Sequence, residues 1–218
     1  MADVKKYTER DFSKVRGLNG LSDKQIEEHL KLYAGYVKRT NALTEKLFGL
    51  CNEGKASGAD PVYAELTRRM GFEYNGMILH EYYFGNMTGG AQAEPPAGGK
   101  LRKAIESSFG GKYDTWLQDF RAVATMPGVG WVILYQDPTT GWLSNHWITL
   151  HEVGNVAGFV PVLVMDVWEH AFLLDYKPAE RPKYIEAFFS NIDWASCEQR
   201  LQQGVSSRPA AAAAAKSE

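Results

Sequence analysis

The sequence predicts an α+β protein, with a long helical hairpin in its N-terminal part and a mixed helix-and-strand C-terminal part. Over residues 21–85 apolar side chains recur at steps of three and four, which is the period of an α-helix. Beyond residue 130 short apolar runs replace this pattern, as expected of strands. A Gly-, Pro- and Ala-rich stretch at 87–100 separates the two patterns. We therefore expect a helical hairpin domain over 1–90 and an α/β domain over 91–204.

The first long helix is expected to begin after Ser22 and to end near Leu50. Ser22 is a good N-cap, and Gln25 stands three residues on, as in a capping box. The predicted inner stripe consists of Leu21, Ile26, His29, Leu30, Tyr33, Tyr36, Val37, Thr40, Leu43 and Leu47. After a loop at 52–60, a second helix is expected from Asp60-Pro61 towards Gly85, because proline suits a first helical turn. Two such helices pack as an antiparallel hairpin.

The C-terminal part is expected to alternate between helices and strands. The expected elements are helices over 99–108 and 112–124, strands over 131–135, 142–150 and 160–165, and helical structure over 181–203. Residues 137–141 supply the turn between the first two strands. Residues 205–218 contain six consecutive alanines and offer no apolar face, so we expect a disordered or weakly helical extension there.

Composition narrows the class of protein. The chain has 218 residues, 44% of them hydrophobic and 23% charged, with a formal net charge of -2. The chain lacks the excess of basic residues that would indicate a nucleic-acid or membrane partner, although local positive charge can still attract small anions. The two cysteines, Cys51 and Cys197, are too few for a disulfide framework. No secretory leader or membrane-spanning apolar run is visible, so the cytoplasm is the expected location.

Histidines and one aspartate suggest a metal site. The five histidines are His29, His80, His146, His151 and His170. His29 and His80 lie on the apolar faces of the two expected helices, where a single histidine is usually a core residue but two can converge. Asp166 closes an apolar run and His170 follows four residues later; iron, manganese and zinc accept this pair of ligand types. An exposed aspartate beside a buried histidine explains the spacing equally well. The absence of clustered cysteines argues against structural zinc.

The segment around Asp166 resembles the signature of the iron/manganese superoxide dismutases. The matching stretches are 166–171 (DVWEHA), 175–177, 181–184, the glycine-rich 128–131, 191–194, 75–80 and 26–29. Together they span roughly residues 20–200 of the chain. The resemblance implies a helical hairpin joined to an α/β domain that contains a three-stranded antiparallel sheet.

The same resemblance implies a metal site and a reaction. The implied ligands are His29, His80, Asp166 and His170, holding one iron ion per subunit, with manganese possible. Val164 stands where iron-preferring members often carry threonine, which favours iron. The implied substrate is superoxide, a small anion, converted to dioxygen and hydrogen peroxide. The implied assembly is a homodimer or homotetramer.

Further roles follow from the resemblance alone. His151 would face the metal-bound solvent, Trp131 and Trp168 would wall the cavity, and Tyr36 would stand at its mouth. Glu169 would cross a dimer interface to the partner subunit's His170. Lys31 and Arg181 are candidates for attracting the anion, although a solvated surface position explains Lys31 equally well. His146 is expected to lie outside the site.

Two features depart from the family pattern. His29 and Tyr36 are seven residues apart, where many members have eight; seven residues make two clean helical turns on one face. An ungapped alignment from Tyr36 would offer Glu28 instead, but a carboxylate there would change charge and softness. The second departure is Phe172-Leu173, where many members carry tyrosines, one of which partners a gateway histidine. The usual proton-delivery route is therefore open to question.

Two other functions remain open at this stage. One is a different non-haem iron enzyme, although such enzymes typically use two histidines and one carboxylate. The other is a non-catalytic, metal-free helical binding protein that kept the fold. Loss of a ligand would favour that second alternative, and all four ligand positions are present in the sequence.

Overall fold

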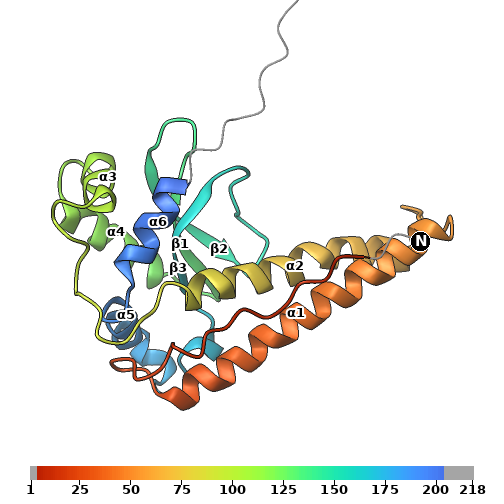
Figure 1. Ribbon diagram of the computed structural model, residues 1–218, viewed down its shortest axis with the longest axis horizontal. Helices are drawn as coiled ribbons and strands as arrows, with labels where there is room; N and C mark the ends of the chain where they lie inside the picture. The colour runs from red at the N-terminus through yellow and green to blue at the C-terminus, as the bar shows by residue number, and fades with distance from the viewer. Residues whose placement is uncertain (1–3, 204–218) are drawn as a thin grey trace, which may run out of the picture.

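The computed structural model describes residues 4–203, and within them the two N-terminal helices form the expected hairpin (Figure 1). Helix α1 runs over Asp23–Asn52 and α2 over Pro61–Phe84. The hairpin projects from the rest of the molecule as a long arm. The extension expected over 205–218 lies outside the described residues.

Helix α1 begins at the cap that the sequence predicted, and a second side-chain cap, at Asp60, begins α2. The Ser22 hydroxyl accepts a hydrogen bond from the Gln25 backbone N–H at 3.1 Å. The Asp60 carboxylate accepts one from the Tyr63 N–H at 2.7 Å, with proline in the first turn of α2. These bonds satisfy N–H groups that a helix start leaves without partners. Helix α1 ends two residues later than expected, which is an ordinary variation at a helix terminus.

The three expected strands form one antiparallel sheet with the order β2-β1-β3. Their bounds are Gly130–Gln136 for β1, Leu143–Thr149 for β2 and Val160–Asp166 for β3. The central strand β1 is buried along its whole length. Trp131 of β1 pairs with Asp166 of β3, so both side chains leave the same face of the sheet. The last residue of β3 is thereby placed beside a tryptophan.

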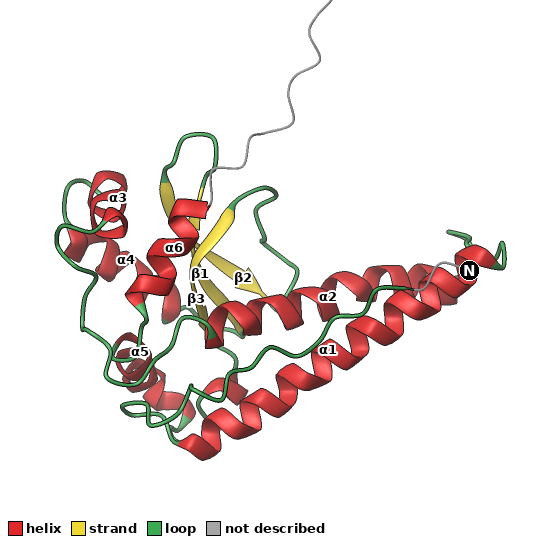
Figure 2. Cartoon of the chain, viewed as in Figure 1, coloured by secondary structure: helices red, strands yellow, loops and turns green. Residues whose placement is uncertain are grey.

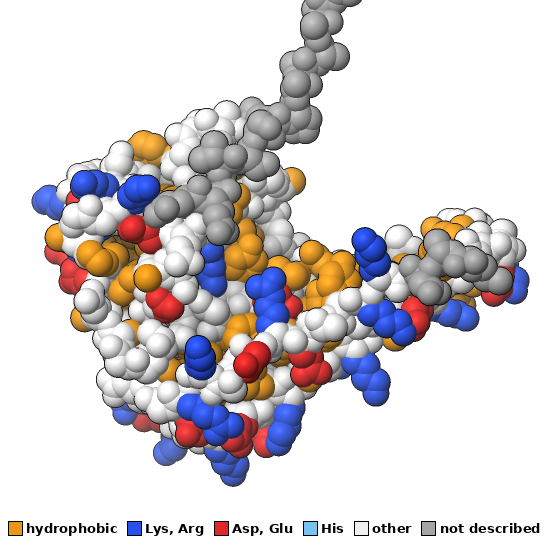
Figure 3. Space-filling view, in the orientation of Figure 1, with side chains coloured by type: hydrophobic (Ala, Val, Ile, Leu, Met, Phe, Trp, Pro, Cys, Tyr) orange, Lys and Arg blue, Asp and Glu red, His pale blue; other side chains and the backbone are white. Residues whose placement is uncertain are grey.

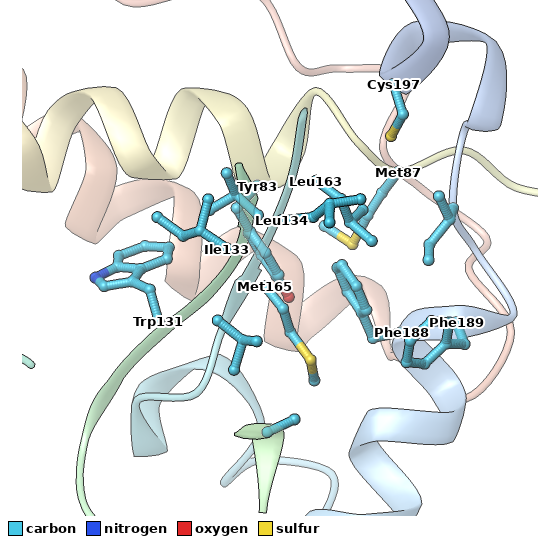
Figure 4. Packing of buried hydrophobic residues seen from close by; sticks show 14 of the residues in the cluster. Tyr83, Met87, Trp131, Ile133, Leu134, Leu163, Met165, Phe188, Phe189 and Cys197 are labelled. Atoms are coloured by element: carbon cyan, nitrogen blue, oxygen red, sulfur yellow. The ribbon is translucent and has the colours of Figure 1, made fainter. Parts of the chain in front are cut away.

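Helices cover the sheet and enclose its core (Figure 2). The remaining helices are α3 (Lys100–Ser108), α4 (Tyr113–Ala124), α5 (Arg181–Phe189), α6 (Trp194–Gln203) and the short 3-10 turns η1 (Glu169–Ala171) and η2 (Pro178–Glu180). In Figure 4 the core runs from Trp131, beside the hairpin, to Phe188 and Phe189 on α5. Cys197 of α6 is buried at the same end as these two phenylalanines.

The helical structure expected over 181–203 is interrupted at residues 190–193. Ile192 forms an isolated antiparallel bridge with Met87, which needs extended backbone. The Asp193 carboxylate then accepts a hydrogen bond from the Ser196 N–H at 3.1 Å and caps a new helix. The apolar period continues through both helices, so the sequence pattern did not reveal the break.

The molecular surface carries charge of both signs. On the face shown in Figure 3, Lys and Arg side chains are interspersed with Asp and Glu. None of the helices in residues 4–203 combines the length and the apolar character that a membrane span needs. The surface of the described part thus offers no large area of a single charge on that face.

Candidate metal centre

Four side chains from four separate elements meet between the hairpin and the sheet. His29 comes from α1, His80 from α2, Asp166 from the end of β3 and His170 from η1. The Oδ2 atom of Asp166 lies 3.1 Å from His29 Nε2, 3.2 Å from His170 Nε2 and 3.7 Å from His80 Nε2. The ligand atoms all lie within 4.8 Å of one another. His29, His80 and Asp166 are fully buried, and the His170 side chain is 23% exposed.

The spacing of these atoms fits a shared metal ion. Two ligand atoms at about 2.1 Å from one ion stand about 3.0 Å apart at a right angle and about 3.6 Å apart at 120°. The three observed separations lie close to that range. His80 Nε2 is also buried without a hydrogen-bond partner among the described residues, which is costly unless something else binds it. Three imidazoles and one carboxylate suit iron or manganese.

One hydrogen bond and burial leave His80 in a form that can bind a metal ion through Nε2. Its Nδ1–H donates to the backbone carbonyl of Gly76 at 2.5 Å, which leaves the Nε2 lone pair directed at Asp166. Burial lowers the pKa of His29, and it lowers the pKa of His80 well below the usual histidine value. Both imidazoles are therefore neutral near neutral pH, as metal coordination requires.

Asp166 is held as a carboxylate by its neighbours. Burial by itself raises the pKa of Asp166, but the charge of His170 and the hydrogen bonds from His170 and His29 outweigh burial and hold the pKa below the usual range. The Oδ1 atom accepts a hydrogen bond from the Trp168 N–H at 2.7 Å. One oxygen is thus fixed by the backbone, and the other faces the three imidazoles.

His151 lies next to this cluster and is fully buried. The Trp131 indole N–H donates to His151 Nδ1 at 3.0 Å, and burial lowers the pKa of His151 to about 4. The ring is therefore neutral at pH 7 with Nδ1 as acceptor, and we infer that the proton sits on Nε2. His151 Nε2–H then donates to the Tyr36 hydroxyl oxygen at 2.7 Å.

Comparison with known proteins identifies the family. Residues 96–200 match the family model described as "Iron/manganese superoxide dismutases, C-terminal domain". The chain is 38% identical to "Superoxide dismutase [Fe]" of Aquifex pyrophilus over 93% of its own length and 94% of that protein. It is 37% identical to "Superoxide dismutase [Fe]" of Aquifex aeolicus over the same shares. It is 36% identical to "Superoxide dismutase [Mn/Fe]" of Aeropyrum pernix, covering 86% and 87%.

The chain belongs to the iron/manganese superoxide dismutase family. It is an oxidoreductase of that class, and the expected α+β fold with a three-stranded antiparallel sheet is confirmed.

Aromatic rings wall the centre in this superoxide dismutase. Trp168 stacks on His151 with ring centroids 4.9 Å apart and on His170 at 5.5 Å. Trp131 meets His80 edge-on at 5.0 Å. These rings cover part of the cluster and restrict the imidazoles that they touch.

Both ring nitrogens of His151 already have protein partners. Nδ1 is bonded to Trp131 and Nε2 to the Tyr36 hydroxyl. A direct hydrogen bond from His151 to metal-bound solvent stays a prediction.

His29 and Glu28 differ in burial, and this difference favours His29 as the ligand. His29 points inward and is fully buried, whereas the Glu28 side chain is 51% exposed and pairs with Lys31 at 2.7 Å. The regular helix α1 also places Tyr36, seven residues after His29, on the inward face.

The other expected residues lie around the centre or outside it. Glu169 is exposed on η1 next to His170. Arg181 donates to the Gly128 carbonyl at 3.0 Å, and the Lys31 charge is offset by its ion pair. His146 lies on β2, bonded to Ser144 at 2.8 Å, outside the cluster.

Sequence reasoning missed two residues that hold the ligand-bearing segments. The Gln25 amide donates to the His170 carbonyl at 2.7 Å and accepts from the Leu174 N–H at 3.0 Å, so it fastens η1 to α1. The Tyr184 hydroxyl donates to the Asp166 backbone carbonyl at 2.7 Å. Gln25 had been interpreted only as part of a helix cap. A polar side chain one position before the buried Ile26 was the available signal.

Proposed function

We propose that His29, His80, Asp166 and His170 hold one iron ion per subunit, with manganese as the second choice, and that superoxide is dismutated there. The observation that carries this proposal is the convergence of three imidazoles on one carboxylate oxygen, together with the buried, unpartnered Nε2 of His80. A bound iron or manganese ion supplies reversible one-electron exchange with superoxide.

Tyr36 and His151 are proposed to hold a proton for the reaction. Two superoxide anions and two protons give one dioxygen and one hydrogen peroxide, so the site must deliver protons. Burial raises the pKa of Tyr36 to about 12, which keeps its hydroxyl protonated. Since His151 Nε2–H donates to the Tyr36 oxygen, the phenolic hydrogen remains available for another acceptor. Trp131 fixes the tautomer on which this depends.

Iron is the proposed metal for two reasons. The two Aquifex relatives carry iron in their names, and the Aeropyrum relative carries both metals. Val164, buried two residues before Asp166, is close in shape to the threonine that the family resemblance associates with iron.

A homodimer is proposed through the surface next to His170, with a homotetramer as the larger alternative. A groove of about 410 Å³ there is lined by Leu32, Leu173 and Leu174, which are 42%, 42% and 54% exposed. Three exposed leucines gathered in one place favour burial by another chain. Leu174→Asp is expected to yield monomers in light scattering, whereas Val62→Asp, at 58% exposure on the far arm, is expected to leave assembly unchanged. Dimers of the Leu174 variant would contradict this assignment.

Metal content and dismutation, measured together, test the central proposal. Protein reconstituted separately with iron and with manganese is compared with Asp166→Asn, and with Asp114→Asn as a control at an exposed position. Loss of metal and activity only at Asp166 is the expected result. Wild-type protein that binds neither metal would instead support the metal-free binding protein. Stoichiometric metal without dismutation would favour a different redox role.

A further inference from the structure

Glu73 is a buried carboxylate that the proposed metal site does not use. Its side chain is 2% exposed on α2. Arg39 of α1 donates from Nε to Oε2 at 2.7 Å, and Arg69 donates from Nε and Nη2 to Oε1 at 2.8 and 2.7 Å. A buried carboxylate is destabilising unless it is paired, and here each oxygen has its own guanidinium. The three groups together carry one net positive charge.

The Arg39 side of this cluster leads to Tyr36. The Arg39 guanidinium carbon lies 4.6 Å from the centroid of the Tyr36 ring, within cation–π range. Glu73 therefore fixes Arg39, and Arg39 covers one part of the ring whose hydroxyl bonds His151 at 2.7 Å. The Gly76 backbone touches the same ring, since a Cβ at that position would lie 2.5 Å from Tyr36 Cδ1.

The Arg69 side of this cluster leads to His151 along α2. The Arg69 guanidinium carbon lies 4.2 Å from the centroid of Phe72. Phe72 in turn packs edge-on against His151 with ring centroids 4.5 Å apart. Two lines of contact therefore run from one buried carboxylate to the two members of a hydrogen-bonded pair. One line passes along α1 and the other along α2.

We propose that Glu73 is a positioning residue for the reaction: through Arg39 and Arg69 it holds the Tyr36 hydroxyl against His151. The inference rests on the proposed proton-holding role of that pair. Glu73 itself touches neither substrate nor metal ligands in this arrangement. Without the carboxylate, both half-exposed arginines lose the charge that keeps them over the rings, and the 2.7 Å hydrogen bond loses its support.

A positioning role and a role in attracting substrate predict different changes in kcat and kcat/KM for Glu73→Gln. The substitution removes a negative charge from a cluster near the centre. If the cluster acted only by attracting superoxide, kcat/KM would rise and depend more steeply on salt. Positioning instead predicts that kcat falls about 10-fold while kcat/KM stays within about twofold, because a misplaced proton group slows the chemical step. Glu65→Gln is the control, since Glu65 pairs with Arg68 on the exposed side of the same helix.

A double-mutant cycle with Tyr36→Phe separates positioning from general stability. In the Tyr36→Phe protein there is no hydroxyl to hold, so adding Glu73→Gln is expected to change kcat by less than about twofold. A crystal structure of Glu73→Gln is expected to show the Tyr36–His151 bond lengthened or broken. Arg39→Gln, at a half-exposed position, repeats the test in case Glu73→Gln folds poorly.

The outcomes distinguish this inference from the proposed function. Additive effects of Glu73→Gln and Tyr36→Phe on kcat, or an unchanged Tyr36–His151 distance, would overturn only the proposed role of Glu73. The proposed function would stand. A Tyr36→Phe protein with full kcat would overturn the proposed role of the pair itself. Metal content is measured in each variant, so that loss of metal is not mistaken for loss of positioning.

Discussion

Gly76 allows Tyr36 to lie where it bonds His151, and Gly76→Ala is expected to move it. A Cβ at Gly76 would lie 2.5, 2.6 and 3.0 Å from the Cδ1, Cε1 and Cγ atoms of Tyr36. Carbon atoms in contact need about 3.5 Å, so the ring must retreat by about 1 Å. A retreat of that size away from His151 would leave the hydroxyl about 3.7 Å from His151 Nε2, too far for a hydrogen bond.

A displacement of this size in a reacting group can lower turnover by up to about 100-fold. The free energy of unfolding is expected to fall by at most about 2 kcal/mol, because about 1 kcal/mol gained from helix propensity partly offsets an overpacking cost of about 1–3 kcal/mol. Gly71→Ala is the matched control on the same helix, since nothing lies within 4 Å of its Cβ position. It should gain about 1 kcal/mol and keep full activity.

The assay is the decay of superoxide per metal-occupied site, followed by stopped flow, with urea unfolding and metal analysis beside it. Metal analysis is essential because the Gly76 carbonyl also accepts the hydrogen bond from His80. Wild-type turnover in Gly76→Ala would refute the argument that Tyr36 must contact His151. Low turnover explained by missing metal would place the effect at His80 instead.

Three further predictions concern the groups around the centre. Trp131→Phe and Trp116→Phe each remove a buried indole hydrogen bond, but only the first is expected to lower turnover, because Trp131 bonds His151 whereas Trp116 bonds Asn145; equal turnover would contradict the tautomer assignment. Tyr184→Phe strands the Asp166 carbonyl and the Tyr83 hydroxyl, so urea unfolding should show a loss of about 1–3 kcal/mol, and an unchanged midpoint would argue against that bond. His151 has its pKa lowered to about 4 by burial, so it stabilises the fold above its unfolded value near 6.5 and loses that contribution as pH falls towards 4. Between pH 6.5 and pH 4, the free energy of unfolding of metal-depleted His151→Gln should therefore fall by roughly 3 kcal/mol less than that of metal-depleted wild type. Identical dependence of the unfolding free energy on pH in the two proteins would rule this out.

The elements that depend on neighbours in sequence were predictable. The period of apolar residues predicted the hairpin. Ser22 marked the first helix start because a cap acts on N–H groups two or three residues away, and proline in the first turn marked the second. The Asp166–His170 spacing was compatible with a metal site, and the family resemblance of the segment around it implied one. The division at residue 90 into two domains stays a prediction.

Other features depend on contacts between distant residues. The sheet order β2-β1-β3 places Trp131 beside Asp166, and no local pattern specifies that order. The break at 190–193 depends on a bridge to Met87, far away in the chain. The His29–Asp166 contact joins residues 137 positions apart, and only packing of the hairpin on the sheet brings them to 3.1 Å.

The sequence by itself determined the family, the starts of the two hairpin helices and the residue types of the proposed metal site. Only the tertiary structure decided which of those side chains are buried and what each one faces. Glu73 shows the difference, since in the sequence it is one more charge on a helix rich in charges. Its burial between Arg39 and Arg69 follows from the way α1 packs on α2. A carboxylate acquires such a role only when water is removed and two opposite charges take its place.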